Sequence, residues 1–142
     1  MRNLGYIFAL AVFGFLGFAF WELSKQVPEK NDVDFGADYQ SVVNAAKVDG
    51  KPIILIFTAS WCGPCQQMKK NVYPSIEVSK VAGYFHWLLI DVDDGRNRSL
   101  TQLYGVNGIP HIEVIDSTGR SKGQSIGGRS PSDFAAFLNE QL

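Results

Sequence analysis

Cysteine and histidine are both scarce in this chain. Among its 142 residues there are two cysteines, Cys62 and Cys65, and two histidines, His86 and His111. A single cysteine pair cannot form the set of disulfides that holds small disulfide-rich domains together, so the fold has to depend on packing. A zinc site needs a second group of closely spaced ligands, which the two distant histidines do not supply. The sequence therefore predicts no metal site and no dissociable cofactor.

The chain also lacks an excess of charge of either sign. It has 13 Lys and Arg residues against 14 Asp and Glu residues, a net charge of −1. Domains that bind nucleic acid usually carry a basic patch, so this balance gives no basis for a nucleic-acid partner. There are no internal repeats and no low-complexity tracts, and the length fits one domain with an appendage.

Long hydrophobic runs are absent with one exception, near the amino terminus. The run over residues 4–21 contains no charged residue and includes five phenylalanines. As a helix it would span about 27 Å, close to the hydrocarbon thickness of a bilayer. Arg2 precedes it, so the positive-inside rule leaves this end in the cytoplasm and exports the rest. We predict a membrane anchor, a single transmembrane helix, over residues 1–22.

A cleaved signal peptide is the main alternative for this run. Cleavage requires small residues at A-x-A spacing, whereas residues 18–24 carry bulky aromatic side chains at those places. A buried helix of a soluble domain is less consistent with the run, because such helices show a polar face. Residues 23–34 are polar and include Pro28. They predict a tether between the membrane and a domain over residues 35–142.

Residues 35–142 have the pattern of an α/β domain. Apolar periodicity predicts helices over 35–48, from the cysteines to about 71, over 75–82, over 97–104 and from 131 onward. It predicts strands over 53–57, 84–92, 111–115 and 124–126. Pro74 has to end or kink the helix that follows the cysteines, because it lacks a backbone N–H.

The two cysteines stand where a buried strand gives way to a helix. A cysteine at a helix amino terminus faces free backbone N–H groups and the positive end of the helix dipole, and both favour the thiolate. The second cysteine lies one helical turn further on, within reach of a mixed disulfide formed by the first. This spacing predicts a redox-active pair. An inert structural disulfide is the alternative.

Two segments resemble the thioredoxin superfamily. The sequence Trp-Cys-Gly-Pro-Cys at 61–65 follows an apolar strand, and Val-Asn-Gly-Ile-Pro at 106–110 resembles the loop whose proline is cis in that family. The resemblance implies a thioredoxin-like α/β fold, a four-stranded mixed sheet with helices on both faces. The nearest pattern is the C-terminal domain of the transmembrane thiol:disulfide interchange reductases.

The resemblance also implies a role for each motif residue. Cys62 is expected to be the attacking nucleophile and Cys65 the resolving thiol. The backbone of Ile109, together with Trp61, is expected to bind the substrate segment. The remaining residues expected to support the active site are Trp61, Gly63, Pro64, Pro110 and His111.

Two positions depart from the family pattern. The family carries a buried acid six residues before the first cysteine, where this chain has Ile56. Cys65 would then be deprotonated by water or by another group. His111 replaces the usual threonine after the cis proline, and a cationic imidazole there would lower the pKa of Cys62 and make the couple more oxidising. The alternative for His111 is a partly exposed residue at the rim with no redox role.

Together these features predict a thiol–disulfide oxidoreductase that reduces protein disulfides, held in the cell inner membrane by its amino-terminal helix with the domain facing the periplasm. Its expected partners are disulfide-containing proteins and a membrane thiol-electron donor that restores the dithiol. Two alternatives remain. One is a dedicated reductant in cytochrome c maturation, although such proteins usually carry an acid where this chain has His111. The other is a non-catalytic thioredoxin-fold binding module.

Overall fold

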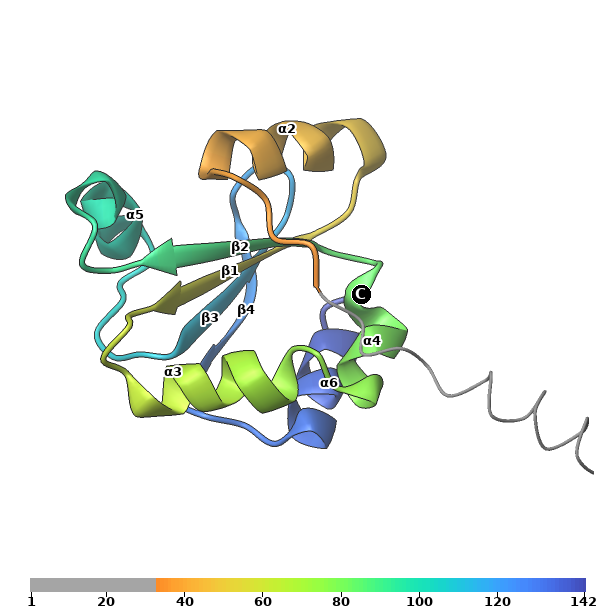
Figure 1. The fold of residues 1–142 in the computed structure, drawn as a ribbon. Coiled ribbons are helices and arrows are strands. Elements are labelled where there is room, and N and C mark those ends of the chain that lie inside the picture. Colours follow the sequence, from red (N-terminus) through yellow and green to blue (C-terminus); the bar gives the residue numbers. More distant parts are fainter. Residues whose placement is uncertain (1–32) are drawn as a thin grey trace, which may run out of the picture.

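A computed structural model describes residues 33–142, which form an α/β domain around one sheet (Figure 1). The predicted anchor, and the predicted tether up to residue 32, lie outside the described residues. Within residues 33–142 no helix combines the length and the apolar character needed to cross a bilayer.

The four-stranded mixed sheet is confirmed, with strand order β2-β1-β3-β4. The strands are β1 (Ile53–Thr58), β2 (His86–Asp91), β3 (His111–Ile115) and β4 (Ser121–Ile126). Strand β1 pairs in parallel with β2 and antiparallel with β3, and β3 pairs antiparallel with β4. The long connection from β1 to the parallel β2 leaves room for the helices that cover one face.

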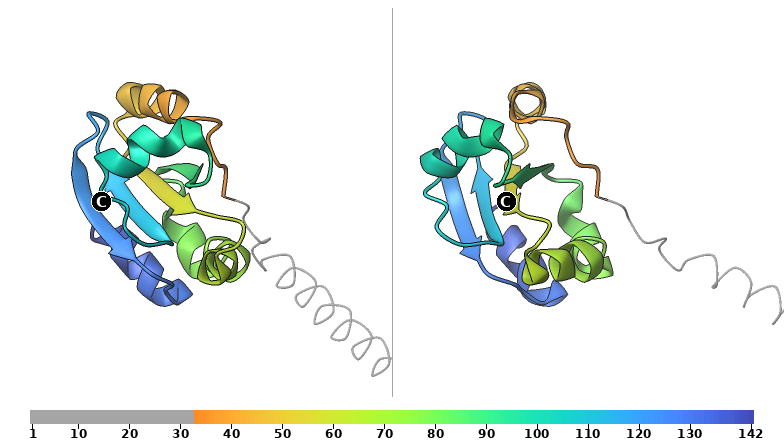
Figure 2. Two further views of the ribbon diagram at one scale, coloured as in Figure 1. Left: turned by 90° about the vertical axis from the view of Figure 1, so that its left-hand side faces the viewer. Right: turned by 60° about the vertical axis from the view of Figure 1, so that its left-hand side comes forward.

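Helices cover both faces of the sheet, as expected. Helices α2 (Tyr39–Asp49) and α5 (Arg98–Leu103) pack on one face, and α3 (Gly63–Gln67), α4 (Ile76–Ala82) and α6 (Pro131–Asn139) lie on the other (Figures 1 and 2). Strand β1 is buried on both faces, and its side chains alternate between the two layers. Phe57 packs in the layer of α2, and Ile56 packs in the layer of α3. This is why the strand reads as a continuous apolar run in the sequence.

Three predicted element boundaries were wrong. The first helix begins at Tyr39 and not at residue 35, because Asp38 caps it and Phe35 instead forms a parallel bridge with Trp87 on the edge of β2. The strand predicted over 84–92 begins at His86. Strand β4 is longer than the predicted 124–126. Its first residues were not predicted, because an edge strand can be polar and then shows no apolar alternation in the sequence.

The helix after the cysteines ends before Pro74, as predicted. Its second half, Met68–Val72, is a π-helical stretch (η1) that continues α3. Residues on its inner side are buried: Met68 is 1% exposed and Val72 is 5% exposed. The cysteine helix is therefore anchored in the core through η1.

The turn between β3 and β4 is organised by Asp116. Its carboxylate accepts hydrogen bonds from the Thr118 hydroxyl at 2.5 Å, from the Thr118 and Arg120 N–H groups, and from the Arg120 guanidinium. The Thr118 hydroxyl is the largest of several causes that together lower the pKa of Asp116 to about 2. The ionised carboxylate is thus the form that stabilises the turn.

We expect the Asp116→Asn variant to lose less stability in acid than the parent chain. A lowered carboxylate pKa contributes stability that is present above the unfolded pKa of about 3.9 and is lost as the pH falls toward about 2. Thermal unfolding midpoints measured from pH 5 to pH 2 should therefore converge for the two chains at the acid end. A constant difference at every pH would contradict this assignment.

Candidate active site

The cysteine pair lies just beyond the carboxyl end of the central strand. Strand β1 ends at Thr58, and Cys62 is the residue that caps the start of α3. Cys62 and Cys65 are joined by a disulfide, with their Cα atoms 5.2 Å apart. This arrangement confirms that the strand-to-helix junction brings the two sulfurs together.

The backbone around Cys62 favours a thiolate once the disulfide is reduced. The Cys65 N–H donates to the Cys62 Sγ at 3.2 Å. An N–H aimed at sulfur stabilises the charged form more than the neutral thiol. Cys62 is 5% exposed and Cys65 is 2% exposed, so the resolving cysteine is the deeper of the two. Cys62 is the sulfur better placed to meet a substrate.

The Ile109–Pro110 peptide bond is cis, as the resemblance implied. Ile109 packs against a small apolar cluster that contains both cysteines and Ala59. The Gly127 N–H donates to the Pro110 carbonyl oxygen at 2.8 Å, which ties the chain after β4 to this loop. No hydrogen bond within residues 33–142 uses the backbone N–H of Ile109. That donor is available to an incoming segment.

Trp61 and Ile109 line the same groove beside the cysteines. The groove has a volume of about 260 Å³ and is lined by Trp61, Val92, Thr101, Val106, Gly108 and Ile109. Trp61 is 69% exposed, and its indole N–H donates to the Asp93 carboxylate at 2.7 Å. We call this surface the Trp61 groove. It is uncharged, and it suits an apolar side chain next to a substrate disulfide.

Asp93 was not assigned to the site from the sequence. It belongs to the turn that leaves β2 at the same end of the sheet as Cys62, because β1 and β2 are parallel. The signal that identifies it is this parallel pairing, since the loops after parallel strands gather at one edge. Asp93 holds the exposed indole of Trp61 in place.

His111 is buried and paired, so the alternative of a partly exposed histidine at the rim was wrong. It is 1% exposed, its Nε2 lies 3.2 Å from Glu113 Oε2, and its ring meets Phe57 edge-on. Glu113 itself is 4% exposed. The proposed effect of His111 on the Cys62 pKa stays a prediction. A His111→Thr variant with unchanged Cys62 pKa and reduction potential would refute it.

The site has no acid at the position of Ile56. That side chain is 1% exposed and packs in the apolar layer with Met68. The cluster around the cysteines holds Ala59, Val92 and Ile109 beside the two sulfurs, and none of these ionises. Deprotonation of Cys65 by water remains consistent with this apolar setting.

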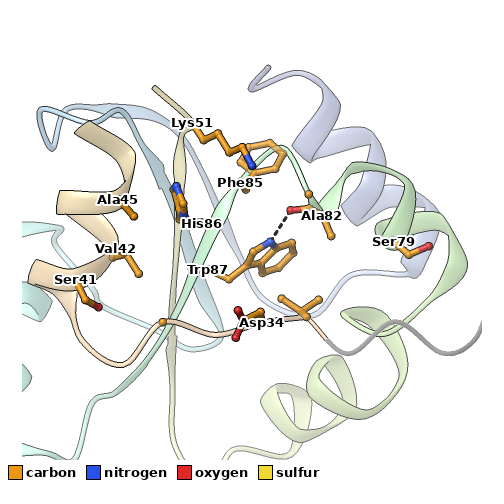
Figure 3. Close-up of a pocket in the computed structure, with 13 residues that line it drawn as sticks. Asp34, Ser41, Val42, Ala45, Lys51, Ser79, Ala82, Phe85, His86 and Trp87 are labelled. Carbon is orange, nitrogen blue, oxygen red and sulfur yellow. Dashed lines mark hydrogen bonds between the residues drawn. The ribbon is translucent and has the colours of Figure 1, made fainter. Parts of the chain in front are cut away.

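A further cavity of about 550 Å³ lies at the other end of the sheet, between α2 and α4 (Figure 3). Trp87 lines it, and the Trp87 indole N–H donates to the Ala82 carbonyl oxygen. His86 lies at its edge, where its Nε2 is 3.0 Å from the Asp49 carboxylate, so it is a hydrogen-bonded structural residue. A six-residue strand, about 20 Å, separates this cavity from the cysteines.

A family model described as a thioredoxin-like domain matches residues 39–142. Thioredoxin of Haemophilus influenzae is 31% identical over 108 residues, which cover 75% of this chain and 92% of that protein. The thiol:disulfide interchange protein DsbD of Colwellia psychrerythraea is 29% identical over 107 residues, 72% of this chain and 18% of that protein.

The chain spans a minor part of several longer relatives. It covers 32% of the chloroplast thioredoxin-like protein HCF164 of Oryza sativa and 40% of HCF164 of Arabidopsis thaliana. Among solved structures, a DsbH oxidoreductase matches with a TM-score of 0.69 and 25% identity over 79% of this chain and 85% of that chain. The reduced C-terminal domain of Neisseria meningitidis DsbD matches with a TM-score of 0.63 and 22% identity, over 72% of this chain and 92% of that one, and shows the shared fold.

Proposed function

Because the chain belongs to the thioredoxin-like family and is a thiol–disulfide oxidoreductase built on the Cys62–Cys65 pair, we propose that it reduces protein disulfides from a position tethered to the inner membrane, with this domain in the periplasm. The observation that carries the proposal is the placement of Cys62 between the start of α3 and the cis Ile109–Pro110 loop. A cysteine pair placed in this way can catalyse thiol–disulfide exchange, which favours an enzyme over a binding module.

The reaction proceeds through two exchanges. The Cys62 thiolate attacks one sulfur of the substrate disulfide, forms a mixed disulfide, and releases the other substrate sulfur as a thiolate that takes up a proton. The Cys65 thiolate then attacks the Cys62 sulfur, and the second substrate sulfur leaves as a thiolate that is protonated in turn. The substrate gains two electrons and two protons, and the enzyme is left with the Cys62–Cys65 disulfide.

Substrate binding uses the groups that surround Cys62. An extended substrate segment pairs with the free Ile109 N–H in the manner of strand addition, which aligns its disulfide over Cys62. One apolar side chain of that segment occupies the Trp61 groove. Burial of such a side chain supplies affinity without requiring a particular sequence.

The reducing direction and the location are supported by features of the sequence. Gly63 and Pro64 between the cysteines resemble reducing members of the family more than dedicated oxidases. The hydrophobic run at 4–21 supports a membrane anchor, and Arg2 before it supports export of the domain. A reductase outside the cytoplasm has to be re-reduced, so a membrane thiol-electron donor completes the cycle.

Labelling of thiols in living cells tests direction and location together. Intact cells of the native host are treated with a small membrane-impermeant maleimide, and modification of the full-length chain is read by mass spectrometry. We expect Cys62 to be labelled in intact cells, because the pair is kept reduced and faces the periplasm. Labelling that appears only after permeabilisation would contradict the location. Labelling that requires added reductant would contradict the reducing direction.

A further inference from the structure

A second groove borders the cysteine motif and shares no lining residue with the Trp61 groove. It has a volume of about 460 Å³ and is lined by Pro64, Gln67, Met68, Asn71, Val72 and Arg129, together with Gly128. Pro64 stands between the two cysteines, so the groove begins at the reactive pair. Its other wall is the segment after β4, which passes beside α3 on the way to α6 (Figures 1 and 2). We call this surface the Arg129 groove.

Arg129 is held in position on that wall. Its Nε donates to the Ser125 hydroxyl, and its guanidinium carbon lies 5.4 Å from the centre of the Phe137 ring. Ser125 and Phe137 are 3% and 8% exposed, so both contacts are with fixed groups of the core. Much of the entropy cost of ordering this long side chain is therefore met before any partner arrives.

The terminal nitrogens of Arg129 are free to bind an anion. Neither Nη1 nor Nη2 donates to an acceptor within residues 33–142. Within residues 33–142 no carboxylate lines the groove, and Arg129 is its one charged lining residue. The Asn71 amide N–H donates to Gln67 Oε1 at 2.8 Å. This bond occupies the oxygen of the Gln67 amide and leaves its nitrogen as a further donor. Both free donor groups suit a carboxylate.

Acidic side chains gather on the other side of the motif. Asp91 ends β2, and Asp93 and Asp94 follow it at the end of the sheet where Trp61 lies. Asp93 accepts from Trp61, and the Asp94 carboxylate is paired with Arg96. A substrate lying across Cys62 thus meets carboxylates beyond the Trp61 groove and a fixed guanidinium in the Arg129 groove. This asymmetry gives an extended segment a preferred orientation.

We propose that the Arg129 groove binds an acidic side chain of the protein substrate, close in sequence to the reacting cysteine, while the Trp61 groove takes an apolar side chain from the other side. The proposal rests on the proposed function, in that the substrate is a protein disulfide. Met68 and Val72 form an apolar floor on which the methylene groups of a glutamate can lie. Arg129 in this role determines specificity, and the exchange chemistry stays with the cysteines.

The size of the effect follows from exposure. Arg129 is an exposed residue, so its pairing with a substrate carboxylate is screened by water and salt. Surface ion pairs contribute up to about 1 kcal/mol, which corresponds to about a fivefold preference. The preference should therefore be measurable at low ionic strength and should shrink toward none at about 0.5 M salt, where the screening length is a few ångströms.

Matched peptide pairs test the proposal. The reduced full-length chain in detergent is mixed with short peptides that carry one cysteine as a mixed disulfide with 2-mercaptoethanol. Each peptide has Glu at one of the three positions on either side of the cysteine, and each has a counterpart with Gln. We expect a Glu peptide to react about fivefold faster than its Gln counterpart for at least one position at low salt. The ratio should fall to about one in the Arg129→Gln variant.

Two further variants make the result specific. Lys47→Gln removes the same charge from α2, on the opposite face of the sheet, and should leave the Glu-to-Gln ratio unchanged. Arg129→Glu should reverse the preference. The salt dependence of the ratio in the unaltered chain provides a readout that does not depend on the folding of any variant.

Three outcomes would overturn the inference. The first is an equal rate for Glu and Gln peptides at every position. The second is a ratio that survives Arg129→Gln. The third is a loss of rate in Arg129→Gln by the same factor for both peptides, which would show that the cation acts on the thiols and not on the substrate. A reduced chain that fails to react with any peptide or with insulin would instead refute the proposed function.

Discussion

Replacement of Cys65 by serine is expected to stop the reaction after its first step and to leave the chain covalently joined to its substrate. Cys62 can still attack the substrate disulfide, but no second sulfur is present to release the product. The Cys65 N–H still donates to the Cys62 sulfur, since it is a backbone group, so the Cys62 thiolate keeps this stabilising contact. Insulin reduction should fall to background while a mixed disulfide accumulates on non-reducing gels.

The matched control is Cys62→Ser, which should show neither turnover nor a mixed disulfide. Both variants should give the circular dichroism of the reduced parent chain, because serine replaces sulfur with a smaller atom at the same place. An equal yield of trapped substrate from the two variants would contradict the assignment of Cys62 as nucleophile and Cys65 as resolving thiol.

Replacement of Glu113 by methionine is expected to lower the free energy of unfolding by about 2 kcal/mol, because it leaves a buried imidazole without the one hydrogen-bond partner that it has within residues 33–142. Glu113 and His111 lie on the same face of β3, and their side chains are 5% and 1% exposed. His111 Nδ1 has no hydrogen-bond partner within residues 33–142, so Glu113 supplies the ring's single polar contact. Urea unfolding of the disulfide form at pH 7 measures the loss.

The double variant Glu113→Met, His111→Leu separates a polar pair from simple packing. Apolar residues of similar volume in place of both members of a buried pair are often neutral or stabilising. The double variant should therefore recover most of the stability that the single variant loses. Equal destabilisation of the single and double variants would contradict the pair as the cause, and would assign the loss to the shape of the two side chains.

Much of the fold was predictable because its central strand and its cysteine motif carry strong local signals. The apolar run over β1 has no polar alternation, as a strand covered on both faces requires. The start of α6 was also clear, since Ser130 caps it and Pro131 occupies its first turn. The cis bond before Pro110 followed from the resemblance and could not follow from the isolated Ile-Pro sequence, because most such bonds are trans.

The parts that were missed depend on tertiary contacts. Strand β4 is polar and forms only because β3 offers it an edge. Phe35 was assigned to a helix on apolar spacing, but its bridge to Trp87 competes with helix formation. The pairing of His111 with Glu113 was not predicted, because the family resemblance relates His111 to the cysteines alone. Residues two apart on a strand share a face, so the spacing of His111 and Glu113 could have indicated that their side chains lie together.

The centre of the candidate site could be predicted from the sequence, and the residues at its edges could not. Each cysteine and the cis proline are where the motif places them. Asp93 and Arg129 come from loops after β2 and β4, and only the sheet order brings these loops to the cysteines. Loops carry few local signals of their own, so residues that determine substrate choice are the hardest to find from a sequence.

The equilibrium reduction potential of the Cys62–Cys65 couple tests the account most directly. The full-length chain in detergent is equilibrated with glutathione buffers, and the fraction of dithiol is read by thiol trapping. We expect a value near the thioredoxin end of the known range, about −270 mV, as a disulfide reductase fed by a membrane donor requires. A value near −120 mV, typical of strong disulfide donors, would contradict the reducing direction.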